Sequence, residues 1–72
     1  MLASNESFFT PTEQEVLRAL IRAGSVTGTS HETGRAVSTL RVHLKHIHAK
    51  TDTHNIGELI VWALSNLEQW AA

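Results

Sequence analysis

The stretch STLRVHLKHIHAK, residues 38–50, combines the apolar spacing of a packed helix with a cluster of basic side chains. Leu40, Leu44 and Ile47 recur at helical intervals, so we expect a helix over about residues 37–51 that buries these side chains. The opposite side of this helix carries basic and small side chains: Ser38, Arg41, Val42, Lys45, His48 and Ala49. A polar flank carries Thr39, His46 and Lys50. The expected helix therefore has one apolar, one basic and one polar side.

Positive charge in this chain is segregated rather than abundant. The 72 residues carry a net charge of −1, yet residues 35–50 hold four of the six lysines and arginines and no acid. The distribution of charge decides which surface attracts a polyanion. Arg and Lys side chains can donate to base edges in the major groove of DNA, and a small apolar side chain can contact a thymine methyl. A solvated amphipathic helix without a ligand explains the same side equally well.

The composition of the chain is that of a small globular protein. A length of 72 residues allows one domain, and 42% hydrophobic with 18% charged residues favours a folded chain over a disordered one. No apolar run is long enough to span a membrane, and the N-terminus lacks the basic start and apolar centre of a signal peptide. Without cysteine there is no disulfide or thiolate chemistry. We expect a cytoplasmic protein without a membrane partner.

Four helices are expected along the chain. Residues 1–8 lack a periodic pattern and are interpreted as a flexible lead-in to one domain at residues 9–72. The sequence Thr10-Pro11-Thr12-Glu13 is typical of a capped helix start, which predicts a helix over residues 11–23 that ends at Gly24. Leu59, Ile60, Ala63, Leu64 and Leu67 predict a fourth helix that ends near Glu68.

The segment SVTGTSHET, residues 25–33, is the weakest of the expected helices. Gly28 and the β-branched residues around it disfavour a helix, so only tertiary packing could make this segment helical. Gly34 after it suits a tight turn. A helix, a short weak helix, a turn and a basic helix form the layout of a helix-turn-helix.

Motifs along residues 9–68 resemble those of the LuxR/NarL/GerE-type family of bacterial DNA-binding domains. They are Phe9-Thr10-Pro11-x-Glu13-x-Glu15-Val16-Leu17, Ser38-Thr39-Leu40-Arg41-Val42-His43-Leu44-Lys45-His46-Ile47, Ala49-Lys50-Thr51 and Glu58-Leu59-Ile60, in the order and at the spacing of the family. The resemblance implies an all-α, four-helix helix-turn-helix domain with its recognition helix at about residues 37–51. It also implies a bacterial, cytoplasmic regulator of transcription that binds double-stranded DNA.

The resemblance assigns roles to residues of this chain. Base contacts are implied at Arg41, Val42 and Lys45. Contacts to the DNA backbone are implied at Thr39 and Lys50, with Ser25 and His46 as weaker candidates. The fourth helix of the family often forms a dimer, which here implies a homodimer interface at Val61, Trp62 and Ser65.

Three departures from the family pattern affect these expectations. The second helix has Gly28-Thr29-Ser30 where relatives usually have a Lys/Glu-Ile-Ala core. Ala36 stands where a serine usually caps the recognition helix, and such a cap is worth about 1 kcal/mol. The low net charge predicts weaker nonspecific binding, because fewer phosphates are neutralised. A module that binds and modulates another transcription regulator is therefore the alternative function.

The histidines and tryptophans allow other interpretations. His43 and His46 stand three residues apart, but the helix separates His43 at the core edge from His48, and no nearby carboxylate or cysteine assists, so no metal or other cofactor is expected. Protonation of His46 or His48 near phosphates would strengthen DNA binding. Trp62 fits an interface or the edge of the core equally well, whereas Trp70 lies beyond the last expected turn.

Other functions find little support in the sequence. Ser30-His31-Glu32 diverge around a helix and form no catalytic triad, and the glycines fit no phosphate-binding loop, so the chain is not expected to be an enzyme. The chain fits either a stand-alone protein or the excised output domain of a longer regulator. The operator sequence, the sign of regulation and any upstream signal lie beyond these patterns.

Overall fold

Five helices form the part of the chain that the computed structural model describes, residues 8–71. They are α1 (Pro11–Ala23), α2 (Val26–Thr33), α3 (Val37–Thr51), α4 (Ile56–Ser65) and α5 (Leu67–Trp70). Residues 8–71 contain no strand, so the prediction of an all-α fold is confirmed. Most of the expected lead-in, residues 1–7, lies outside the described residues. No helix within residues 8–71 is long and apolar enough to cross a membrane.

Helix α1 begins and ends where its sequence predicts. The Thr10 hydroxyl accepts a hydrogen bond from the Glu13 N–H (3.1 Å), and the Glu13 carboxylate accepts one from the Thr10 N–H (3.0 Å). This reciprocal cap satisfies two N–H groups that a helix start leaves unpaired. At the other end, Gly24 adopts a left-handed φ of 77°, and its N–H donates to the Leu20 carbonyl.

Helix α2 forms although its sequence disfavours a helix. The Ser25 hydroxyl caps its start by accepting from the Gly28 N–H (3.0 Å), and the buried Thr29 hydroxyl donates to the Ser25 carbonyl (2.7 Å). A Cβ atom on Gly28 would lie 2.8 Å from the Cβ of Ala23, so only glycine allows this approach between α2 and the end of α1. Tertiary packing therefore overrides the weak propensity of the segment.

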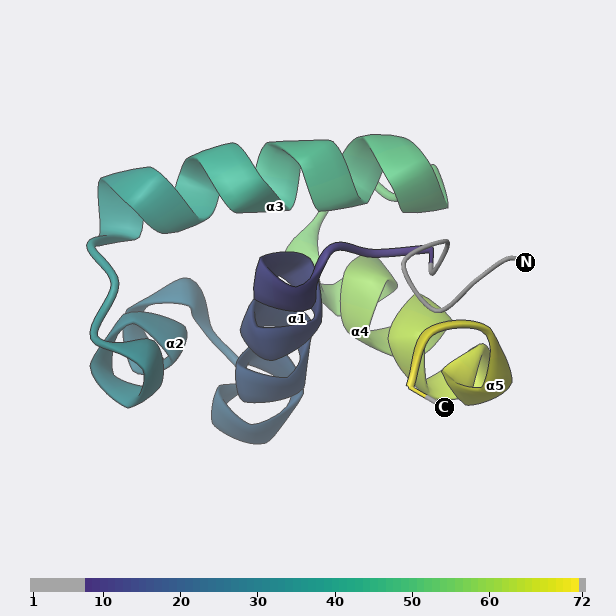
Figure 1. The fold of residues 1–72 in the computed structure, drawn as a ribbon, viewed down its shortest axis with the longest axis horizontal. Helices are drawn as coiled ribbons and strands as arrows, with labels where there is room; N and C mark the ends of the chain where they lie inside the picture. Colours follow the sequence, from purple (N-terminus) through teal and green to yellow (C-terminus); the bar gives the residue numbers. More distant parts are fainter. Residues whose placement is uncertain (1–7, 72) are drawn as a thin grey trace.

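Helix α3 lies along one side of the molecule, with α1, α2 and α4 packed against a single side of it (Figure 1). Ala36 precedes it without a side-chain cap, as its sequence predicts. The helix ends at Asp52, which adopts a left-handed φ of 56° and turns the chain toward α4. The outer side of α3 carries no other helix of the described chain.

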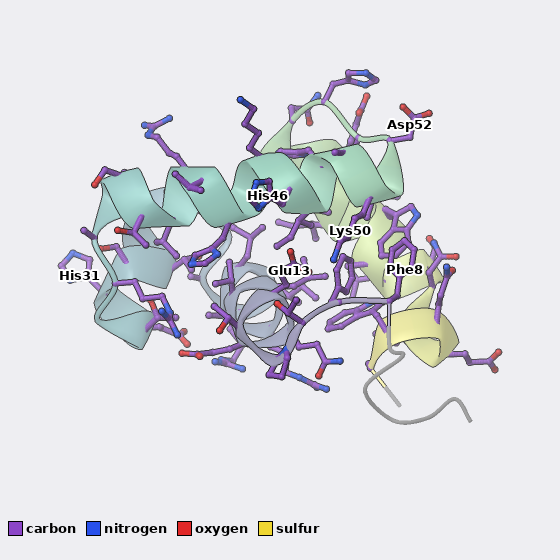
Figure 2. All side chains as sticks on the ribbon, turned by 45° about the horizontal axis from the view of Figure 1, so that its top comes forward. Phe8, Glu13, His31, His46, Lys50 and Asp52 are labelled. Atoms are coloured by element: carbon purple, nitrogen blue, oxygen red, sulfur yellow. The ribbon has the colours of Figure 1, made fainter. Side chains whose placement is uncertain are left out.

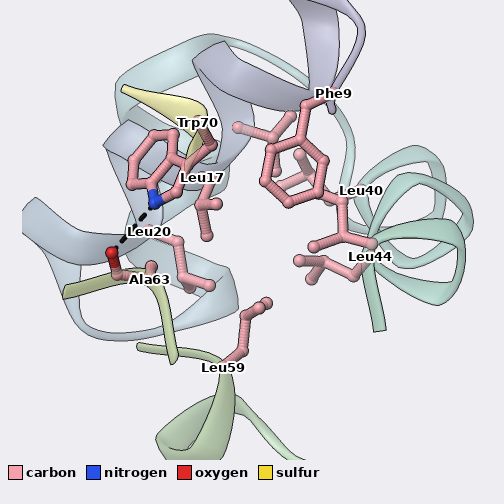
Figure 3. Close-up of a cluster of buried hydrophobic side chains, with 10 residues drawn as sticks. Phe9, Leu17, Leu20, Leu40, Leu44, Leu59, Ala63 and Trp70 are labelled. Atoms are coloured by element: carbon pink, nitrogen blue, oxygen red, sulfur yellow. Dashed lines mark hydrogen bonds between the residues drawn. The ribbon is translucent and has the colours of Figure 1, made fainter. Parts of the chain in front are cut away.

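The core lies where the helices meet (Figure 3). Its buried apolar side chains are Phe9, Val16, Leu17, Ala19, Leu20, Leu40, Leu44, Ile47, Leu59, Ala63 and Trp70. The prediction that α3 contributes Leu40, Leu44 and Ile47 is confirmed, since none of them is more than 4% exposed.

The end of the chain differs from its prediction. The expected fourth helix does not continue to Glu68, because the backbone of Asn66 leaves helical geometry and its side-chain amide donates to the Trp62 carbonyl (2.7 Å). The chain then forms α5, which brings Trp70 back to the core at 3% exposure. The indole N–H of Trp70 donates to the Ala63 carbonyl (2.9 Å), as Figure 3 shows. The expectation of four helices is therefore wrong, and Trp70, beyond the last expected turn, belongs to the core.

Candidate nucleic-acid interface

The outer side of α3 presents the three side chains expected to contact bases. Arg41 and Lys45 are exposed one turn apart, and Val42 between them is 56% exposed. Leu44 on the same helix is buried, so the backbone of this surface is fixed by the core. A rigid helix that holds two cationic donors beside an apolar side chain has the elements that recognition in a major groove requires.

Ion pairs distinguish Arg41 and Lys45 from the other cations of the chain. Within residues 8–71, neither side chain forms a hydrogen bond, an ion pair or a ring contact. The other four cations all have partners. These are Arg18 with the Ala71 carbonyl (3.4 Å) and the Trp70 ring, Arg22 with Glu32 (2.8 Å), Arg35 with Glu15 (3.0 Å), and Lys50 with Glu13 (2.6 Å). The cations with no internal partner are thus adjacent on one exposed surface.

A shallow hollow lies beside these two cations, between α3 and the segment that leads into α4. Its volume is about 590 Å³. The residues that line this basic hollow are Val26, Arg41, Leu44, Lys45, His48, Thr53, His54, Asn55 and Ile56. Its charged or titratable members are basic, so it favours an anion over a cation.

The residues expected to contact the DNA backbone have different environments. Thr39 and His46 are exposed on α3, and Figure 2 shows His46 on the side of that helix that faces the viewer, above Glu13. The hydroxyl of Ser25 is already engaged as the cap of α2. Lys50 is directed toward Glu13 and Phe8, where its ammonium donates to the carboxylate of Glu13 (2.6 Å) and to the carbonyl of Phe8 (3.2 Å) (Figure 2). Lys50 is thus bound within the fold, which its helical position alone did not reveal.

Glu13 is a buried acid whose charge is held by its partners. Burial raises the pKa of this carboxyl, but hydrogen bonds from Lys50 and the Thr10 N–H, with the charges of Lys50 and His46, outweigh that effect. The pKa of Glu13 is therefore below its usual value of 4.5. For an acid with a lowered pKa, the stabilisation is present above the pKa of the unfolded chain and is lost as the pH falls through the folded pKa.

We expect Glu13→Gln to lower the free energy of unfolding at pH 7 by about 1–3 kcal/mol. Glutamine keeps an oxygen for the Thr10 N–H but leaves the Lys50 ammonium without a carboxylate. The difference between wild type and variant should shrink as the pH falls below the usual carboxyl value of 4.5, because the unfolded chain then takes up a proton that folded Glu13 does not. Urea unfolding followed by circular dichroism at several pH values measures this difference.

The control for this variant is Glu15→Gln. Glu15 also forms an ion pair, with Arg35, but its side chain is 50% exposed, so its removal should change stability by less than about 0.5 kcal/mol. A Glu13→Gln deficit of equal size at pH 7 and pH 3 would contradict the assigned role of the Glu13 charge.

The histidines of α3 do not share one environment. His43 is half-buried at the edge of the core, as expected. His48 was expected on the exposed side but is half-buried, and its Nδ1 lies 2.7 Å from the Thr53 hydroxyl oxygen. Within residues 8–71, no three His, Asp or Glu side chains gather in a way that could hold a metal ion.

The expected dimer surface on α4 is only partly exposed. Val61 is 65% exposed and Ser65 is also exposed, but Trp62 stacks on Phe8 (ring centroids 5.7 Å apart) and meets the edge of Phe9. Trp62 therefore belongs largely to the edge of the core rather than to an outward surface. Two further apolar side chains on this part of the molecule are exposed: Leu64 at 53% and Leu67 at 46%.

Comparisons of the chain with models of protein families, with curated proteins and with solved structures found no match.

Proposed function

We propose that this chain is a helix-turn-helix domain that binds duplex DNA through the outer side of α3 and regulates transcription. In this proposal α2, the turn at residues 34–36 and α3 form the motif, and α3 is the recognition helix. The observation that carries the proposal is that Arg41 and Lys45, alone among the cations, have no internal partner within residues 8–71 and flank the exposed Val42.

Each of these side chains has a distinct role in the proposal. Arg41 would donate two hydrogen bonds to one guanine, and Lys45 would donate to a neighbouring base edge. Val42 would contact a thymine methyl. Thr39 and His46 would donate to phosphates, which position α3 without specifying sequence. Lys50 would contact a phosphate only if its ion pair with Glu13 broke first.

A homodimer would place two copies of α3 on one side of the DNA. The exposed apolar side chains Val61, Leu64 and Leu67, with the exposed Ser65, supply a surface on α4 and α5 for such an interface. Two-fold symmetry would then require half-sites about one helical turn apart on the DNA.

Selection of bound sequences from random duplex DNA tests the proposed function. We expect one half-site to be enriched, with a second copy about 10 base pairs away. Binding should also weaken steeply with added salt, because each neutralised phosphate contributes about −0.9 to the slope of log K against log salt. Retention of no duplex above background at low salt would overturn the proposal.

The second candidate is a module that pairs with another transcription regulator. The exposure of Val61, Leu64 and Leu67 on α4 and α5 favours it, and Leu64 and Leu67 line one hollow. An interface of this kind should respond little to salt, in contrast to DNA binding. The salt titration therefore distinguishes the two functions.

A further inference from the structure

A chain of hydrogen bonds connects His48 to the backbone at the end of α3. His48 Nδ1 lies 2.7 Å from the hydroxyl oxygen of Thr53, which lies 2.8 Å from that of Thr51. The Thr51 hydroxyl donates to the carbonyl of Ile47 at 3.0 Å. Both threonines are buried, so water does not replace these partners.

The direction of donation along this chain fixes the protonation of one histidine nitrogen. The Thr51 hydroxyl has one hydrogen, and the Ile47 carbonyl can only accept it, so Thr53 must donate to Thr51. The Thr53 hydroxyl has then used its own hydrogen and must accept from His48, whose Nδ1 therefore carries a hydrogen. The opposite direction would leave two oxygens 3.0 Å apart, in Thr51 and Ile47, without a hydrogen between them.

The other ring nitrogen of His48, Nε2, is left for solvent or a ligand. Within residues 8–71, Nε2 of His48 has no hydrogen-bond partner. In that range the one fully buried side-chain nitrogen or oxygen without a partner is Nε of Arg35, so Nε2 of His48 is not fully buried. His48 Nε2 is therefore accessible to solvent. Because Nδ1 already carries a hydrogen, protonation of the ring adds a donor at Nε2 and keeps the bond to Thr53.

The charges around His48 are those of the basic hollow. Arg41 and Lys45 line it from α3, and His54 lines it from the segment before α4. Two acids adjoin this group without lining the hollow: Asp52, whose N–H donates to the His48 carbonyl, and Glu58, which lies 3.5 Å from His54 Nδ1. Helix α2 contributes only the apolar Val26 to the lining. The charged and titratable side chains that line the hollow are therefore all basic.

We propose that His48 is a proton-linked DNA contact, which takes up a proton as a phosphate or an acceptor on a base edge approaches Nε2. This inference rests on the proposed function and adds a residue and a pH dependence to it. The negative charge of bound DNA favours a proton on His48, so binding and protonation favour each other. Affinity should therefore rise as the pH falls from 8 to 6, by at most about tenfold per pH unit for one linked proton.

The variant that tests this inference is His48→Asn. The amide nitrogen of asparagine occupies nearly the position of Nδ1 and can donate to Thr53, but the side chain has no nitrogen that takes up a proton. We expect this variant to fold and to bind DNA more weakly than the wild type, with a smaller deficit at pH 8 than at pH 6. The ratio of its affinity at pH 6 to its affinity at pH 8 should be about ten times smaller than that ratio for the wild type.

One control variant separates His48 from a histidine outside the proposed interface. His31→Gln removes an exposed imidazole on α2 that does not line the basic hollow, and it should retain the pH response. Nitrogen-15 NMR of the wild type without DNA should show hydrogen on Nδ1 of His48 at pH 8, which tests the hydrogen-bond chain without any DNA.

The outcomes distinguish this inference from the proposed function. Wild-type binding that does not change with pH, or an equal pH response in His48→Asn, would overturn the role of His48 and leave DNA binding intact. Hydrogen on Nε2 alone at pH 8 would also overturn it. An absence of wild-type binding at both pH values would overturn the proposed function together with this inference.

Discussion

Replacement of both Arg41 and Lys45 by alanine is expected to abolish sequence-specific DNA binding and to leave the fold intact. Both side chains are exposed and without internal partners within residues 8–71, so their removal breaks no contact that stabilises the chain. Each good contact to a base edge is worth about 1–3 kcal/mol, so the double variant should bind at least about 30-fold more weakly. A mobility-shift titration measures the affinity, and circular dichroism with thermal unfolding confirms the fold.

The control for this prediction is Arg22→Ala, which removes a cation from α1 that pairs with Glu32 on the surface. It should change stability and affinity little, because an exposed pair is worth about 0–1 kcal/mol. Arg41→Ala alone should relax specificity at one base position. If the double variant bound the selected sequence as the wild type does, the outer side of α3 would not be the surface that contacts bases.

Local patterns were sufficient to predict α1 and α3. Thr10, Pro11 and Glu13 define a helix start through neighbours only three residues apart, and the spacing of Leu40, Leu44 and Ile47 defines the buried side of α3. The same spacing placed Arg41 and Lys45 outward, where the structure has them. Such information lies within one or two turns of a helix, so a single sequence contains it.

The features that the sequence did not predict depend on segments distant along the chain. The bond between Lys50 and Glu13 joins residues 37 positions apart, and a helical wheel of α3 cannot show what α1 places beside it. His48 meets Thr53 only because Asp52 turns the chain with a left-handed φ. Gly28 has a low helix propensity, yet its missing side chain is what lets α2 approach α1.

Trp70→Ala is expected to destabilise the protein more than any other single change considered for this chain. Trp70 is 3% exposed, meets the edge of the Phe9 ring (centroids 6.2 Å apart) and donates to the Ala63 carbonyl. Truncation of a buried tryptophan costs about 3–5 kcal/mol, and a domain of this size has a total stability of about 5–15 kcal/mol. Since α5 is short and has no side-chain cap, it should detach with the loss of this anchor.

Urea and thermal unfolding followed by circular dichroism measure the effect of Trp70→Ala, which should lower the melting temperature by about 15 °C or more. Trp70→Phe keeps most of the ring but loses the indole N–H, so it should cost much less, about 1 kcal/mol for the hydrogen bond. Leu67→Ala, on the same short helix but 46% exposed, is the matched control and should cost about 0.5 kcal/mol. An equal melting temperature for wild type and Trp70→Ala would mean that α5 does not pack on the core in solution. The order of the three variants therefore tests whether the ring of Trp70, rather than the presence of α5, stabilises this end of the fold.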